Sequence, residues 1–146
     1  MAKRAARATG PRFLGNALIV EDDALNAMAL EQALLDDGAA SVTVCATTAA
    51  AMAALEKLRP DVIVLDVNLA DRNDGWALAE LVMELTPRPP RIIFSTGSPQ
   101  SIPPNIAELG IVMAKPYEPE RLVEALHGQQ DSHGLLSRLR DAISTH

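Results

Sequence analysis

The sequence predicts an α/β domain with a five-stranded parallel sheet and helices on both faces of that sheet. Five short apolar runs alternate with segments of helical periodicity, which is the pattern of repeated strand–helix units. The run at 62–65 is apolar at every position, as is typical of a parallel strand buried on both faces. The length of 146 residues suits one domain, and right-handed crossovers place helices on both faces of such a sheet.

The first strand–helix unit starts with the apolar run 17–20, which ends in the acids Glu21, Asp22 and Asp23. Apolar residues at helical spacing then predict a helix that stops near Gly38. These apolar residues are Leu25, Met28, Ala29, Ala33 and Leu34. An aspartate after a strand commonly caps the following helix, so Asp22 or Asp23 can serve as the N-cap.

The second unit begins with a β-branched run at 42–45, which predicts an extended strand. Thr47 or Thr48 can cap the helix that comes next. This helix is expected to reach about Leu58, because Pro60 lacks a backbone donor and cannot continue it.

The third strand, at 62–65, ends at Asp66, and a helix is expected from about Gly75 to Leu85. The fourth strand is expected at 92–94, and three small residues close it: Ser95, Thr96 and Gly97. The fourth helix is expected to be short, because the segment from 98 to 104 holds prolines at 99, 103 and 104.

The fifth unit completes the sheet. Residues 111–114 form an apolar run that predicts the last strand, and Lys115-Pro116 follow it directly. A final helix of the body is expected from about Pro119 to Leu126. The domain is therefore expected to span residues 16–128.

Charge and cysteine content exclude several classes of protein. The net charge is −6, so the chain is a poor partner for phosphate backbones. One cysteine, Cys45, cannot build a disulfide framework and argues against a cysteine-based zinc site. No apolar run approaches the roughly 20 residues of a membrane span, and no signal-peptide pattern begins the chain. We therefore expect a cytoplasmic protein with no membrane partner.

Two flanking segments differ from the body in composition. Residues 1–15 carry four basic and no acidic side chains and are expected to be a disordered leader. Residues 129–146 begin as a polar link and then carry apolar residues at helical spacing, which predicts a short amphipathic tail helix. That helix would pack on the body or on a second chain.

Polar side chains follow four of the five predicted strands. Three acids end the first strand, Asp66 ends the third, Thr96 the fourth and Lys115 the fifth. The functional crevice of an open parallel sheet lies beyond the carboxyl ends of its strands, so these side chains are expected on one rim. Each residue alone has a common structural explanation, such as a helix cap or a turn, but the whole set in this order favours one site.

A cluster of carboxylates is unfavourable unless a cation compensates its charge. Mg²⁺ prefers oxygen ligands and keeps several waters, so Asp22 and Asp66 are the candidate ligands, with Glu21 holding a metal-bound water. Asp66 could then act as a carboxylate nucleophile and form an aspartyl phosphate. Thr96 and Lys115 could each bind a phosphoryl oxygen.

With these residues the sequence resembles a response-regulator receiver domain of bacterial two-component signalling. The matching residues are Glu21 and Asp22 after the first strand, Asp66 after the third, Thr96 after the fourth and Lys115-Pro116 after the fifth. The resemblance implies a flavodoxin-like sheet of order 2-1-3-4-5, phosphorylation of Asp66 and dependence on Mg²⁺. It also implies that the backbone carbonyl of Asn68 joins the metal site.

The sequence departs from the family pattern at the switch. The position three before Lys115 usually carries an aromatic residue in this family, and here it is Val112. The interval from Thr96 to Lys115 is also short and rich in proline. Residues 94–97, Phe-Ser-Thr-Gly, are similar to the Phe-Ala-Thr-Gly signature of an alphaproteobacterial group of stand-alone receivers.

The resemblance implies a histidine kinase or a histidine phosphotransfer protein as donor and a downstream protein as target. We expect a phosphoacceptor rather than an enzyme, without a DNA-binding domain, and leave a homodimer open. Two alternatives remain. One is a phosphate-independent pseudo-receiver that serves only as a binding module. The other is a phosphatase of the haloacid-dehalogenase type, which Asn68 disfavours because those enzymes place a second aspartate at that position.

Overall fold

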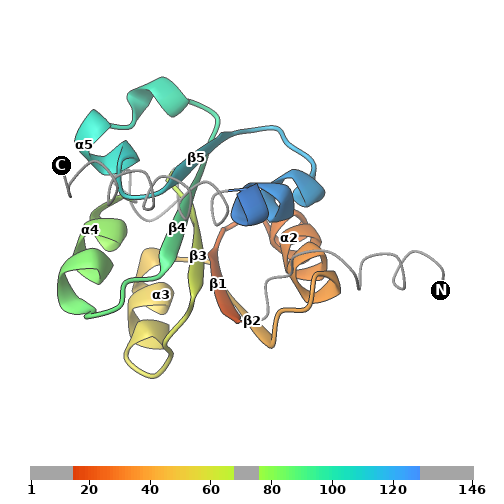
Figure 1. The fold of residues 1–146 in the computed structure, drawn as a ribbon, viewed down its shortest axis with the longest axis horizontal. Helices are drawn as coiled ribbons and strands as arrows, with labels where there is room; N and C mark the ends of the chain where they lie inside the picture. Colours follow the sequence, from red (N-terminus) through yellow and green to blue (C-terminus); the bar gives the residue numbers. More distant parts are fainter. Residues whose placement is uncertain (1–14, 68–75, 129–146) are drawn as a thin grey trace, which may run out of the picture.

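The computed structural model describes residues 15–67 and 76–128, and these form a single open sheet with helices on both sides (Figure 1). All neighbouring strands are parallel, and their order is β2-β1-β3-β4-β5. The strands are β1 (Asn16–Val20), β2 (Ser41–Cys45), β3 (Val62–Asp66), β4 (Arg91–Thr96) and β5 (Ile111–Ala114). The predicted fold class, strand number and strand order are confirmed.

The helices lie in two layers. One face of the sheet is covered by α3 (Thr48–Leu55), α4 (Trp76–Leu85) and the short α5 (Pro104–Ala107). The other face is covered by α2 (Ala24–Asp36) and by a helix at residues 119–128, drawn in blue in Figure 1. This arrangement buries both faces of β1, β3 and β4, which explains why the run 62–65 has no polar residue.

The two layers create two separate cores. Phe94 and Leu65 point to the side of α3 and α4 and are fully buried there. Ile19 and Ile93 point to the opposite side, where they pack with residues of α2 and of the helix at 119–128. Successive strand residues alternate between the two cores, so one slip in register would exchange every contact.

Local signals in the sequence set the starts of α2 and α3. The side chain of Asp23 accepts a hydrogen bond from the backbone N–H of Asn26 at 3.0 Å, and Thr47 does the same for Ala50. Of the two caps proposed for each helix, Asp23 and Thr47 are therefore the ones used. The helix expected to reach Leu58 ends at Leu55, because residues 56–57 form a turn.

The segment between β4 and β5 is short, as its prolines predict. It forms one 3₁₀ turn, η1 (Pro99–Ser101), and the single α-helical turn of α5. Two isoleucines anchor the segment, because Ile102 and Ile106 are only 5% and 3% exposed and pack into the core beside α4. The prolines shorten this helix without detaching it from the sheet.

No helix in residues 15–67 and 76–128 is both long enough and apolar enough to cross a bilayer. Three expectations lie outside these residues: the basic leader, the backbone carbonyl of Asn68 and the C-terminal tail helix.

Candidate functional site

The carboxyl ends of the strands bring the predicted residues to one rim. Glu21 directly follows β1, Asp66 ends β3, Thr96 ends β4 and Lys115 directly follows β5. The register of the sheet pairs Asp66 with Ser95 and Thr96 with Ala114. Thr96 therefore lies diagonally across the β3–β4 pair from Asp66, and Lys115 follows β5, one strand further along the sheet.

Three acids meet at this rim. Glu21, Asp22 and Asp66 each place a carboxylate oxygen within 4.8 Å of the others. Glu21 and Asp66 are 3% and 5% exposed, whereas Asp22 is exposed. Buried carboxylates at this spacing repel one another, so the cluster needs positive charge close by.

Lys115 supplies positive charge from the fifth strand. Its Nζ lies 3.2 Å from Glu21 Oε1 and 3.3 Å from Asp66 Oδ2. Burial by itself lowers the pKa of Lys115, but the carboxylates of Asp66 and Glu21 outweigh this effect and raise the pKa. The ammonium is therefore held in its charged form between the two buried acids.

Glu21 is fixed by its own neighbours. Its side chain accepts hydrogen bonds from the Asn26 amide and, at 3.4 Å, from the backbone N–H of Asp23. Burial raises the pKa of Glu21, as does the nearby carboxyl of Asp66, while the Asn26 bond and the Lys115 charge act in the opposite direction. Asn26, in the first turn of α2, is a site residue that the sequence reasoning missed.

Asp22 does not cap a helix in the structure. The N-cap of α2 is Asp23, so the exposed carboxylate of Asp22 is not used to start the helix. Helix capping therefore does not explain why Asp22 lies in the cluster of three acids. This removes the main competing explanation for Asp22.

Thr96 is fully buried at the end of β4. Its Oγ1 accepts a hydrogen bond from the backbone N–H of Ser98 at 2.9 Å, and its carbonyl accepts one from the N–H of Lys115 at 2.7 Å. A hydroxyl can donate its proton while it accepts a bond. Thr96 therefore connects the end of β4, next to Asp66, with the start of η1 and with the backbone of Lys115.

The donor set suits a hard divalent cation. Glu21, Asp22 and Asp66 offer only carboxylate oxygens, and Mg²⁺ prefers oxygen ligands. Cys45, the single cysteine, contributes its backbone carbonyl to Glu21 N–H rather than a sulfur ligand to the cluster. The carboxylates at this rim thus fit a Mg²⁺ ion.

Val112 lies in β5 opposite Phe94 and is partly buried, without an aromatic ring at this position. The aromatic ring of Tyr117 packs against the core on the other face of the sheet. The Tyr117 hydroxyl is 2.9 Å from Ser95 Oγ, and Ser95 is 1% exposed. Burial raises the pKa of Tyr117, with a smaller opposing effect from the Ser95 bond. The sequence reasoning missed this pair, for which the position of Tyr117 two residues after Lys115 is the only signal.

Comparison with known proteins shows to which family this chain is similar. Residues 17–127 match the family model described as the response regulator receiver domain. The chemotaxis protein CheY of Thermotoga maritima is 27% identical over 112 residues, which cover 75% of this chain and 92% of that protein.

Two solved structures are also similar. A CheY-like receiver domain from Methanospirillum hungatei is 25% identical with a TM-score of 0.68, covering 82% of this chain and 96% of that one. The receiver domain of the PhyR response regulator from Erythrobacter litoralis is 26% identical with a TM-score of 0.64, covering 82% and 89%. The match to the family model includes all five strands, except the first residue of β1, and every strand end at the acidic rim, so the chain belongs to the response regulator receiver domain family.

Proposed function

We propose that this chain is a phospho-accepting switch that takes a phosphoryl group onto Asp66 from a histidine kinase or a histidine phosphotransfer protein. The observation that carries the proposal is the contact of Lys115 Nζ with Asp66 Oδ2 at 3.3 Å, inside a cluster of three acids. A buried aspartate, a fixed ammonium and spare carboxylates at one rim are what an aspartyl phosphate requires.

The transfer begins with attack of an Asp66 carboxylate oxygen on the phosphorus of a phosphohistidine. An O–P bond forms as the P–N bond breaks, and the electron pair of the broken bond stays on the imidazole nitrogen, which takes a proton from solvent. Lys115 already lies beside Asp66, so its ammonium can bind an oxygen of the transferred group without rearrangement.

Asp22 and Asp66 would bind Mg²⁺ directly, Glu21 would bind one of its waters, and the Asn68 carbonyl would complete the protein ligands. The bound ion would neutralise the charge of the carboxylates and of the incoming phosphoryl group. Glu21 is already oriented for this role by Asn26 and by the N–H of Asp23.

Thr96 is the residue that would report phosphorylation to the surface. Its hydroxyl can donate to a phosphoryl oxygen, and its present bond to Ser98 N–H ties it to the start of η1. Movement of Thr96 toward Asp66 would therefore pull on the segment 97–106. The output would be binding to another protein. It would not involve rotation of an aromatic ring at position 112, because Val112 has none.

The donor protein would approach over the start of α2. Leu25 and Met28 are 80% and 62% exposed there, within two turns of Asp22. Exposed apolar side chains next to an acceptor site suit a protein partner more than a small solute. We therefore place the donor's docking surface on these residues.

Acetyl phosphate tests the phosphoacceptor function without any partner. Incubated with Mg²⁺ and acetyl phosphate, the protein should gain one phosphoryl group by intact-mass measurement, and omitting Mg²⁺ should suppress the gain. A chain that acquires no adduct under any condition would be a pseudo-receiver, and continued release of inorganic phosphate with rapid turnover would indicate a phosphatase.

The docking surface is tested separately. Leu25→Asp should slow phosphorylation by a phosphorylated histidine phosphotransfer protein that labels the wild-type chain, but leave acetyl phosphate labelling unchanged. Leu35→Asp, at the far end of the same helix and 43% exposed, is the matched control. Equal slowing by the two variants would refute the surface but not the acceptor.

A further inference from the structure

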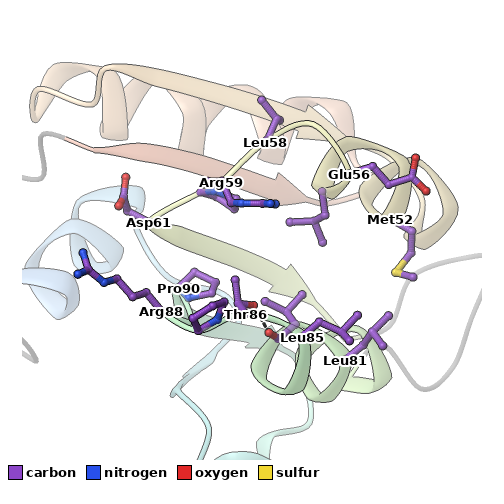
Figure 2. A pocket seen from close by; sticks show the side chains of 14 residues that line it. Met52, Glu56, Leu58, Arg59, Asp61, Leu81, Leu85, Thr86, Arg88 and Pro90 are labelled. Atoms are coloured by element: carbon purple, nitrogen blue, oxygen red, sulfur yellow. Dashed lines mark hydrogen bonds between the residues drawn. The ribbon is translucent and has the colours of Figure 1, made fainter.

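A large groove lies between α3 and α4, at the end of the sheet opposite Asp66. Its volume is about 870 Å³, and Figure 2 shows Asp61 and Arg88 at one end and Met52 and Leu81 at the other. The ends of both helices and the turns before β3 and β4 form its walls. We call it the α3/α4 groove.

The α3/α4 groove has an apolar floor and a charged rim. Large apolar side chains along it remain exposed: Leu85 is 73%, Met52 38% and Leu58 37% exposed. Its charged residues, such as Glu56 and Arg88, are exposed at the edges rather than buried among the apolar ones. An apolar trough with a polar edge suits an amphipathic helix better than a small polar ligand.

The described chain ends near this groove. Arg91 Nη1 donates to the carbonyl of Leu126 at 2.9 Å, and the N–H of Arg91 donates to the carbonyl of Asp61 at 2.9 Å. Asp61 lines the groove, so the side chain of Arg91 bridges from the groove's edge to the last turns of the helix at 119–128, which lies on the opposite face of the sheet.

The next residues of this chain have the pattern that the groove requires. Apolar residues recur on one helical face of the segment 135–143. They are Leu135, Leu136, Leu139 and Ile143. The six residues 129–134 that connect them to the body can span about 20 Å when extended, which is enough to pass around the edge of the sheet.

We propose that residues 135–143 dock as an amphipathic helix in the α3/α4 groove of the same molecule. The short connection gives the segment a high effective concentration at the groove, which a separate partner lacks. Charges also match, since the rim residues Glu56 and Arg88 can pair with Arg140 and Asp141 of the segment. Docking covers Leu85, and another protein reaches this face only by displacing the segment.

This inference does not depend on phosphorylation, because the groove and Asp66 lie at opposite ends of β3. The helix at 119–128 also lies close to the end of α2, where His127 Nε2 is 2.9 Å from Asp37 Oδ2. The connection alone would therefore let the segment reach Leu35 of α2 as easily as the groove. Leu35 thus provides a control for simple proximity.

Disulfide trapping in the full chain tests the proposal. In a Cys45→Ala background, Leu85→Cys is combined with Leu139→Cys, and the control combines Leu35→Cys with Leu139→Cys. Under mild oxidation the Leu85 pair should form a disulfide within one chain in several-fold higher yield than the Leu35 pair. Disulfide-linked dimers would make a second copy the occupant, and equal yields would leave the groove without this helix; either result overturns the proposal.

Hydrogen exchange gives a second readout without engineered cysteines. Amides of residues 135–143 should be protected in the wild-type chain, and Leu85→Asp should remove that protection. Leu85 is mostly exposed, so this change should leave the body folded, as exchange in β1 and β3 will show. Protection that survives Leu85→Asp but not Leu35→Asp, or its absence in the wild type, would contradict docking in the groove.

Discussion

Replacing Asp22 by asparagine should make the metal-free protein more stable and the Mg²⁺-bound protein no more stable than the wild type. Asp22 belongs to the cluster of three acids but does not cap α2. The change removes one charge at nearly constant shape, and it takes away no hydrogen bond from the start of the helix.

The magnitude follows from the spacing of the acids. Two unit charges about 5 Å apart repel by about 0.8 kcal/mol in water and by about 3 kcal/mol at an effective dielectric constant of about 20. Asp22 is exposed, so the lower figure applies to its repulsion with Glu21 and with Asp66. Lys115 offsets part of this repulsion, and we expect a gain of about 1 kcal/mol in the free energy of unfolding.

Mg²⁺ should remove this advantage of the variant. An ion present at about 100 times its Kd stabilises the folded state by about 2.7 kcal/mol, and a tenfold weaker site gains only about 1.4 kcal/mol at the same concentration. The loss of one ligand carboxylate would therefore cancel the advantage of the variant. The wild type and Asp22→Asn should then differ by less than about 0.5 kcal/mol.

Urea unfolding with and without Mg²⁺ measures both effects. Asp23→Asn is the matched control, because it removes a neighbouring charge while asparagine keeps the N-cap of α2. This control should show an almost unchanged response to Mg²⁺. If Asp22→Asn gains as much from Mg²⁺ as the wild type, Asp22 is not a ligand and the reasoning fails.

Three further predictions concern other parts of the domain. Burial raises the pKa of Tyr117, so the neutral phenol stabilises the fold below its ordinary pKa of about 10, and this contribution is lost as pH rises through the raised value. Phenolate absorbance of this single tyrosine should show a higher midpoint in the native than in the guanidinium-unfolded protein; equal midpoints would contradict the burial argument. Gly110→Ala should destabilise the protein by about 1–3 kcal/mol in urea, because its Cβ would lie 2.1 Å from a carbonyl oxygen of β4, whereas Gly97→Ala meets no atom within 4 Å and should change little. Beryllofluoride should alter hydrogen exchange in residues 97–106, because Thr96 connects the site to η1; a change confined to 119–126 would place the response in the last helix instead.

The sheet could be predicted from the sequence because its signals are local and repeated. A strand such as 62–65 must be apolar throughout when helices cover both faces, and this pattern is visible without a structure. The prolines at 99, 103 and 104 likewise limit the helix after β4 by removing backbone donors. The acids that follow the strands could be expected on one rim because the strands are parallel.

Other features depend on contacts between distant residues. Whether Asp22 or Asp23 caps α2 is a choice of geometry that two adjacent aspartates do not reveal. The hydrogen bond between Ser95 and Tyr117 forms only when β4 and the segment after β5 pack together. The α3/α4 groove likewise forms where the ends of two helices come together, and the sequence of neither helix reveals it by itself.

The central prediction, that Asp66 carries the phosphoryl group, can be tested directly. After reaction with acetyl phosphate and Mg²⁺, borohydride reduces an acyl phosphate to an alcohol, so a phosphorylated aspartate becomes homoserine and peptide sequencing by mass spectrometry can locate it. We expect homoserine at position 66 alone and none in the Asp66→Asn variant. Reduction at Asp22 or Glu21 in the wild type, or an adduct that forms on Asp66→Asn at the wild-type rate, would contradict it.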